Sequence, residues 1–384
     1  MNKLLNNKKA SQFTFLFKEL KYINKYIVFS MMFLTLFGIL NIYLATKWTS
    51  TPLFYATKQL VWFLVSLIAL YFLLRLDYRK LYKYSNFLYW LGILLLILTK
   101  LIGTNIGGGT RWFVFGPISF QTTEVVKLFI IFMIGSKLEE FEGNVNNTKN
   151  LIKIILYLTL PILLVFIEPD LGMSIIIIFM VFCMILISGL DIKIILSTSM
   201  ILIVSLLIFW NIGIIKDYQK GRVLSFLNQS NDLEVKGYHL NQSLNAIGSG
   251  GILGNMPSIK NDGTSSYAGY NVPEIQTDFI FAAIANQFGL LGSLILLSIY
   301  GIMLFNMIKI SKNSKDIFGA TVSSGIIAYF LLAIFQNIGM AIGITPISGI
   351  TLPLVSYGGS SLLTTILSLG IILNIGMRKE NLIF

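Results

Sequence analysis

The chain has 384 residues, of which 55% are hydrophobic and 12% are charged, whereas soluble domains carry roughly 25% charged residues. This composition excludes a soluble globular domain and indicates an integral membrane protein. The single cysteine and single histidine exclude a disulfide framework and leave few ligands for a zinc or haem site. The net charge of +12 is expected to mark the cytoplasmic face of the membrane, and no nucleic-acid partner is expected.

Ten apolar segments reach or approach the roughly 20 residues that cross a bilayer. Helices are predicted at about residues 26–46, 58–74, 84–102, 121–136, 151–167, 171–190, 193–214, 277–308, 318–343 and 358–377. The first segment has bulky side chains and no small-residue cleavage site, which favours a retained helix over a signal peptide. The predicted fold class is all-α, with a single polytopic domain covering residues 1–384.

The distribution of positive charge predicts the orientation. Most of the 29 lysines and arginines lie at the two termini and in the loops on their side of the membrane. The exception is one long loop at about residues 215–276, between the seventh and eighth helices, and long loops translocate largely regardless of charge. Both termini are therefore expected in the cytoplasm, and the long loop is expected outside.

Two charged candidates lie at the start of the fourth predicted helix. Glu124 and Lys127 are three residues apart and share a helix face, and Arg111 lies before them in a glycine-rich stretch at membrane-interface depth. Ionisable groups inside a membrane helix are functional candidates by default. The alternative is a mutual structural ion pair, and the sequence leaves both open.

Three further stretches are expected on the outer face. Asp170 follows a proline and is expected to cap the sixth helix. An amphipathic stretch at 238–247 leads into Gly-Ser-Gly-Gly, a type of loop whose amides can approach an anion, while the lone His239 is a poor catalytic candidate. Residues 337–361 are uncharged and rich in Gly and Pro. Non-helical backbone at membrane depth requires burial or a hydrated cavity, so this stretch is expected to line a site.

Asp278 stands at the entrance to an apolar stretch, 279–308, that contains no charged side chain. It is either the N-cap of the eighth helix or a general base, and the residues alone do not choose between these roles. Glu274 lies on the same expected side and is a second acidic candidate.

Six motifs occur in an order that resembles the SEDS family (shape, elongation, division and sporulation proteins), and within it the elongation type, RodA, more than the division type, FtsW. They are GGGTRW, QTTEVVK, EPDLG, GYHLNQSLNAIGSGG, PEIQTDFIFA and LPLVSYGGSS. The resemblance implies a peptidoglycan glycosyltransferase in the bacterial cytoplasmic membrane that polymerises lipid II during cell elongation. It also implies a class B penicillin-binding protein as partner.

The resemblance also implies roles for individual residues. Asp278 matches the family's essential aspartate and is expected to act as general base, with Arg111 and Lys127 stabilising the pyrophosphate leaving group. The expected substrate-binding residues are Arg111, Glu124, Lys127, Glu274, Gln242, Ser243, Ser356 and Ser360. No cofactor and no dedicated metal ligands are expected, although a divalent cation on the pyrophosphate is left open.

The sequence departs from the family pattern at several auxiliary positions. Thr122 stands where proline is usual, Glu168 where glutamine is common and Gln276 where histidine often occurs, while Asn286 and Gln287 replace a frequent Glu-Glu pair.

Three other hypotheses remain for the function: a lipid II flippase or transporter, a scaffold that only recruits the penicillin-binding protein, and a division or sporulation homologue.

Overall fold

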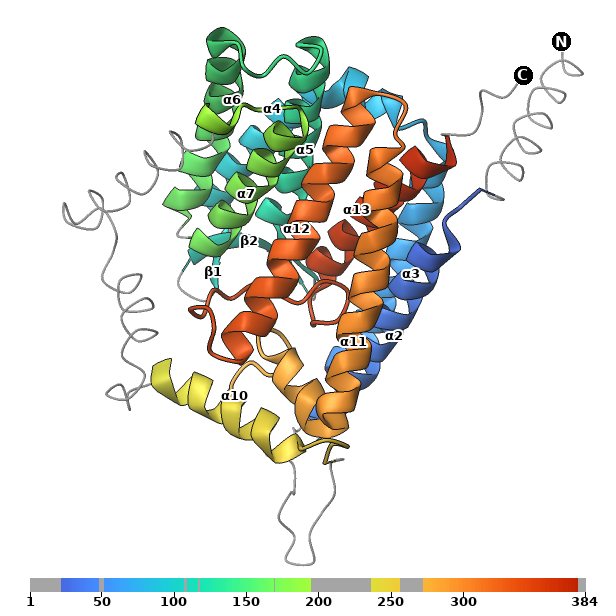
Figure 1. Cartoon of the computed structure of the whole chain (residues 1–384). Helices are drawn as coiled ribbons and strands as arrows, with labels where there is room; N and C mark the ends of the chain where they lie inside the picture. The colour runs from blue at the N-terminus through green and yellow to red at the C-terminus, as the bar shows by residue number, and fades with distance from the viewer. Residues whose placement is uncertain are drawn as a thin grey trace, which may run out of the picture.

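The computed structural model describes residues 22–47, 52–106, 109–116, 118–168, 170–194, 236–255 and 272–378. They form a bundle of long helices with a small sheet and a surface helix toward one end (Figure 1). The helices are α2 (Lys25–Thr46), α3 (Pro52–Arg75), α4 (Arg79–Ile102), α5 (Thr122–Glu140), α6 (Thr148–Ile167), α7 (Leu171–Ile187), α10 (Lys236–Gly250), α11 (Ile280–Lys312), α12 (Ile317–Ala341) and α13 (Gly359–Met377). The strands are β1 (Thr104–Ile106), β2 (Gly109–Phe115) and β3 (Ile118–Gln121).

Nine of the ten predicted spans correspond to described helices. Seven of these helices, all except α5 and α7, have the length and hydropathy of membrane spans. The span predicted at 193–214 lies outside the described residues apart from its first two residues. The predicted outer loop of 215–276 contains an ordered helix, α10, so this segment is more structured than the sequence indicates.

Connections predicted on the side of the termini gather at one end of the bundle, which we call the termini end. Contacts between elements at this end join Asn24 to Asn306, Tyr78 and Arg79 to Asp316, Glu139 to Phe318, and Arg378 to Asp77. The sheet, the α6–α7 connection, α10 and the 342–358 loop lie toward the opposite end, which we call the site end (Figure 1). The alternation of the described helices agrees with the predicted topology, while the end that faces the cytoplasm stays a prediction.

The sheet corrects the all-α prediction. Its three antiparallel strands follow the order β1-β2-β3 and lead directly into α5. β2 is rich in aromatic and β-branched residues, which suit a pleated, half-buried surface. The sequence of this stretch is rich in Gly, with a Pro before β3, and for this reason it does not indicate strands.

The long helix α11 is also interrupted, at Gly289, whose φ is 63° and ψ is −161°. The turn that follows α10 inserts at this break, where Leu290 N donates to Gly251 O at 2.9 Å. A Cβ on Gly250 would lie 2.1 Å from Ala285 O, so the Gly-Ser-Gly-Gly segment lets α10 approach α11. Its first three residues belong to α10, which contradicts the expectation of an open anion-binding loop.

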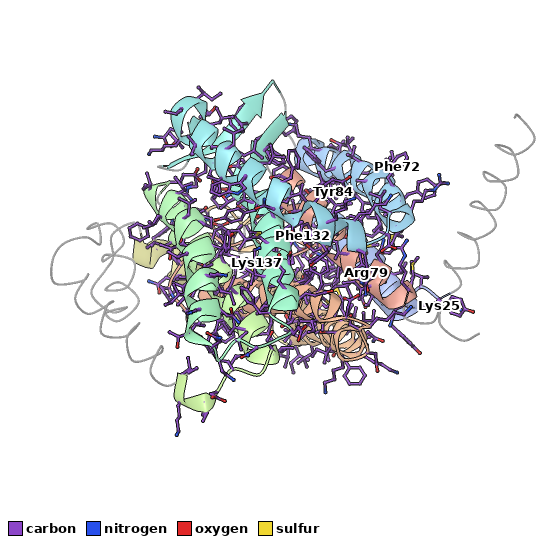
Figure 2. The ribbon with its side chains drawn as sticks, turned by 90° about the horizontal axis from the view of Figure 1, so that it is seen from above. Lys25, Phe72, Arg79, Tyr84, Phe132 and Lys137 are labelled. Carbon is purple, nitrogen blue, oxygen red and sulfur yellow. The ribbon has the colours of Figure 1, made fainter. Side chains whose placement is uncertain are left out.

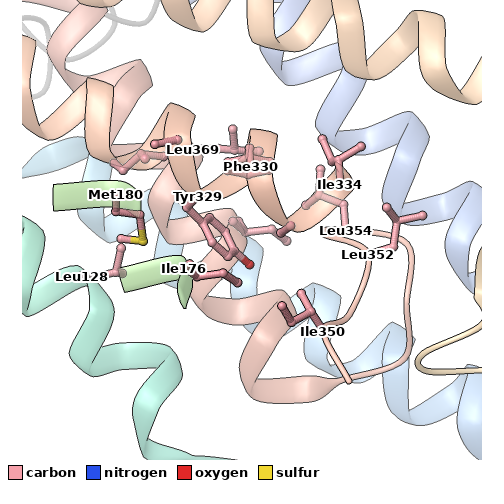
Figure 3. Close-up of a cluster of buried hydrophobic side chains, with 14 of the residues drawn as sticks. Leu128, Ile176, Met180, Tyr329, Phe330, Ile334, Ile350, Leu352, Leu354 and Leu369 are labelled. Atoms are coloured by element: carbon pink, nitrogen blue, oxygen red, sulfur yellow. The ribbon is translucent and has the colours of Figure 1, made fainter. Parts of the chain in front are cut away.

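Helices α12 and α13 form the interior of the bundle. In the most apolar 18-residue stretch of each of these two helices, 72% and 78% of the residues are buried. The corresponding fractions for α3, α4 and α6 are 28%, 33% and 17%, because these helices present apolar faces outward. In the view from the termini end, Phe132 of α5 lies inside the bundle and Phe72 of α3 on its edge (Figure 2). Core side chains of α5, α7 and α12 belong to the same buried cluster as Ile350 and Leu352 of the 342–358 loop (Figure 3), so the hydrophobic core extends into this loop.

Candidate active site

Asp278 lies in a tight turn just before α11. The carbonyl of Glu274 accepts hydrogen bonds from the backbone amides of Thr277, Asp278 and Phe279, at 3.1, 3.1 and 3.3 Å. Glu274 adopts a positive φ of 50°, which reverses the chain into this turn. The helix N-cap is Phe279, so the interpretation of Asp278 as the N-cap residue is wrong.

The 342–358 loop and α12 hold this turn through its backbone. Tyr357 N donates to Gln276 O at 2.9 Å, and Ser356 Oγ donates to Thr277 O at 2.6 Å. Asn337 Nδ2 donates to the carbonyls of Asp278 and Ile350, at 2.9 and 2.7 Å. Three successive carbonyls of the turn therefore have buried or partly buried partners, which fixes where the Asp278 side chain starts.

The loop is in turn held by polar groups of other helices. Gln59 of α3 donates to Ser356 O at 3.0 Å and accepts from Gly358 N at 3.1 Å. Tyr300 of α11 donates to Pro353 O at 2.5 Å. The loop is largely buried between 350 and 356, as non-helical backbone at membrane depth requires. That this stretch lines a substrate site stays a prediction.

The Asp278 carboxylate is half-buried and faces the backbone of Gly349. A Cβ on Gly349, whose φ is 71°, would stand 3.6 Å from Asp278 Oδ2. The neighbouring loop residues Ser348 and Ile350 contact Gly172, two residues after Asp170. The loop thus connects the Asp278 turn to the α6–α7 connection.

Arg111 of β2 forms an ion pair with Asp170 in this connection. Arg111 Nη1 lies 3.2 Å from Asp170 Oδ2, which also accepts from Gln121 Nε2 at 3.1 Å. Asp170 Oδ1 accepts from Met173 N at 3.2 Å, which confirms the predicted cap of α7. The Arg111 side chain remains 22% exposed, so it can still meet an anionic ligand.

Glu168 is an unusual neighbour of this ion pair. It is only 1% exposed, and neither carboxylate oxygen has a hydrogen-bond partner in the described part of the chain. Burial, followed by the charge of Asp170, raises the pKa of Glu168 to about 8, against smaller opposing effects of Arg111 and Lys100. Glu168 therefore carries a proton at neutral pH.

Glu124 and Lys127 are paired with each other inside the bundle. Lys127 Nζ lies 2.5 Å from Glu124 Oε2, and that oxygen also accepts from Thr364 Oγ1 at 3.1 Å. Lys127 is fully buried, with its ammonium 3.6 Å from the ring centre of Tyr329. This geometry agrees with the alternative that Glu124 and Lys127 form a mutual structural ion pair. Contact of the pair with substrate stays a prediction.

All three predicted substrate-binding serines, Ser243, Ser356 and Ser360, make internal hydrogen bonds. Ser243 Oγ donates to Ala341 O at 2.8 Å and fastens α10 to the end of α12, and Ser360 Oγ accepts from Gln121 N at 3.3 Å. Gln242 is half-buried on α10 and Glu274 is exposed. Burial lowers the pKa of His239, and the charge of Glu274 opposes this effect. The net lowering favours the neutral imidazole.

Several residues that position the site were not identified from the sequence. They are Gln59, Gln121, Tyr300, Tyr329, Asn337 and Thr364. Polar side chains inside apolar segments were the available signal, because such groups hydrogen-bond between membrane helices. Within the described ranges, no group of three or more His, Cys, Asp or Glu residues is arranged to hold a metal ion.

The fold and this site define a class: a multi-pass membrane protein with an acidic turn at one end and a non-helical loop, buried between 350 and 356, that holds it. The model of the FtsW, RodA and SpoVE family of cell cycle proteins matches residues 23–381. The chain belongs to this family.

Individual relatives agree with this assignment. The probable peptidoglycan glycosyltransferase FtsW of Coxiella burnetii is 32% identical over 86% of this chain and 88% of its own length. The peptidoglycan glycosyltransferase MrdB of Escherichia coli K12 is 33% identical over 78% of this chain and 79% of its own. A chain solved in a peptidoglycan synthase complex, in work on the coordination of polymerization and crosslinking, is 26% identical with a TM-score of 0.81. It covers 94% of this chain and 99% of that one.

Proposed function

We propose that this chain is a peptidoglycan glycosyltransferase that polymerises lipid II, a disaccharide-pentapeptide carried on polyprenyl pyrophosphate. Family membership and the activity for which its relatives are named support this function. The observation that carries it is the Asp278 turn, whose carbonyls are held by the 342–358 loop and α12 while the carboxylate faces Gly349.

In the proposed reaction, a sugar hydroxyl of the acceptor attacks the anomeric carbon of the donor. Asp278 accepts the hydroxyl proton as general base. The new C–O bond forms as the bond to the pyrophosphate breaks, and the pyrophosphate leaves with the electron pair. Arg111, which is partly exposed beside Asp170, stabilises the leaving negative charge. Lys127 is fully buried and paired with Glu124, so we assign it a supporting role through Glu124 and Thr364.

The partner that we propose is a class B penicillin-binding protein, which crosslinks the new strand. A similar solved chain comes from a peptidoglycan synthase complex. We further propose the elongation role, based on the resemblance of residues 337–361 to the elongation type. The FtsW and MrdB relatives are about equally similar to this chain, so this role needs its own test.

The activity test compares Asp278→Asn with Glu274→Gln in the purified full chain bound to its partner. Both changes replace an acid of the same turn by its amide. Asp278→Asn is expected to abolish glycan polymerisation from lipid II, while the exposed Glu274→Gln is expected to retain most of it. Wild-type rates for Asp278→Asn would overturn the general-base assignment. Absence of glycan product from the wild-type complex in detergent would instead favour the flippase or scaffold hypothesis.

The role is tested by complementation. A plasmid copy of this chain is introduced into bacteria depleted of either their elongation or their division homologue. We expect rod shape to be restored in the first strain and septation to remain blocked in the second. Rescue of division alone would overturn the elongation role.

A further inference from the structure

A cavity of about 330 Å³ lies at the termini end, between α4, α5 and α6. It is separate from the Asp278 turn, which lies at the opposite end of the bundle. Lys137 of α5, which lines this cavity, is seen beside α6 in the view from the termini end (Figure 2). The proposed glycosyltransferase reaction does not use this cavity.

The lining changes from cationic to apolar along the helix axis. α6 contributes Lys153 near its first turn, then Leu156 and Leu160. Lys153 and Leu160 are seven residues apart, which places them about 10 Å from each other along the axis. Trp90 of α4 lines the cavity and is 52% exposed, and Leu156 is 64% exposed. The cavity thus combines a charged mouth with apolar walls that open outward.

The mouth carries one positive charge in excess. Lys137 Nζ lies 2.9 and 2.8 Å from the two carboxylate oxygens of Glu140, so these charges compensate each other. Lys153 forms no ion pair with an acid in the described part of the chain. Its ammonium lies 5.7 Å from the ring centre of Phe141, near the outer limit of a cation–π contact. The positive charge of Lys153 at the mouth is therefore available to bind an anionic group.

We propose that this cavity binds an anionic phospholipid of the leaflet at the termini end. The lipid phosphate lies between Lys153 and Lys137, and an acyl chain lies against Trp90, Leu156 and Leu160. Basic pockets between membrane helices are suited to acidic headgroups because hydrocarbon surrounds the rest of the molecule. A soluble phosphate ester would use the cationic mouth alone and leave the apolar walls uncovered, so the lining favours a lipid.

The test measures lipid bound to the purified full chain in detergent by native mass spectrometry. The probes are phosphatidylglycerol, phosphatidylcholine and glycerol 3-phosphate. Phosphatidylglycerol is expected to bind most tightly, and Lys153→Gln is expected to lower its affinity about fivefold. Glu140→Gln is expected to raise the affinity, because it removes the carboxylate that competes for Lys137. Lys149→Gln is the matched control, since this exposed lysine at the start of α6 does not line the cavity.

Equal binding of phosphatidylglycerol and phosphatidylcholine would overturn the proposal, as would equal losses in Lys153→Gln and Lys149→Gln. Glycerol 3-phosphate binding as tightly as phosphatidylglycerol would overturn the lipid assignment. All variants change exposed or partly exposed side chains, and their thermal unfolding is measured to confirm that they are folded. None alters the Asp278 site, so this result is independent of the polymerisation assay.

Discussion

Replacing Glu168 by glutamine should stabilise the protein, and the gain should depend on pH. Glutamine has nearly the same shape and lacks the ionisable proton. Glu168 is almost fully buried and its carboxylate oxygens have no partners among the described residues. Deprotonation would place an uncompensated charge in this environment, with Asp170 nearby. The structure therefore predicts a penalty that glutamine avoids.

The size and sign of the penalty follow from the raised pKa of Glu168, about 8 in the folded protein against an ordinary value of 4.5. Below pH 4.5 the side chain is protonated in both the folded and unfolded states, and the penalty is absent. Above pH 4.5 only the unfolded chain releases the proton, and stability falls by about 1.4 kcal/mol per pH unit. The loss reaches about 3 kcal/mol at pH 7 and levels off above pH 8.

The assay is thermal unfolding of wild type and Glu168→Gln in detergent between pH 4.5 and pH 8.5. The two proteins should unfold at similar temperatures near pH 4.5, and the variant should be more stable by about 5 °C at pH 7. Glu142→Gln, an exposed acid in the α5–α6 connection, is the control and should give no pH-dependent gain. A constant difference across the pH range would refute the reasoning, because it would show that Glu168 is charged in the folded protein.

Three other substitutions test the site. Ser356→Ala removes the hydrogen bond that joins the loop to Thr277 O of the Asp278 turn and a second one that Leu352 N donates within the loop. It should lower both lipid II turnover and stability, the latter by about 1–3 kcal/mol in thermal unfolding. Lys127→Met leaves Glu124 buried without its partner and should destabilise the folded protein by about 3–5 kcal/mol. The double variant Lys127→Met with Glu124→Gln should be less destabilised, and equal losses of stability would contradict the paired geometry. Gly349→Ala strains a positive φ beside Asp278 and should reduce turnover more than Gly343→Ala, which strains a similar φ elsewhere in the loop.

The helices could be predicted because the bilayer demands long apolar segments, and this signal lies within each segment. The sheet at 104–121 and the break at Gly289 could not be predicted in the same way. Glycines separate the strands, and the sequence around Gly289 is apolar on both sides. The break depends on the turn after α10, which lies more than thirty residues earlier in the chain.

The site was predicted as a set of residues on one face, but its pairings were not. Arg111 pairs with Asp170, and Ser356 binds the carbonyl of Thr277. Each pair joins distant parts of the sequence, and hydropathy and spacing carry no information about such contacts. The structure thus adds an internal hydrogen bond of Ser356 that its motif did not indicate, while substrate binding by this serine stays a prediction.

The three bonds to the Asp278 turn make it possible to separate geometry from chemistry. The carbonyls of Gln276, Thr277 and Asp278 accept from Tyr357 N, Ser356 Oγ and Asn337 Nδ2. Asp278→Asn keeps all three carbonyls, whereas Ser356→Ala removes a donor and keeps the carboxylate. A general base therefore requires Asp278→Asn to lose activity far out of proportion to any loss of stability, while Ser356→Ala loses both. If both variants lost stability and activity in the same proportion, Asp278 would act by holding the turn rather than by accepting a proton.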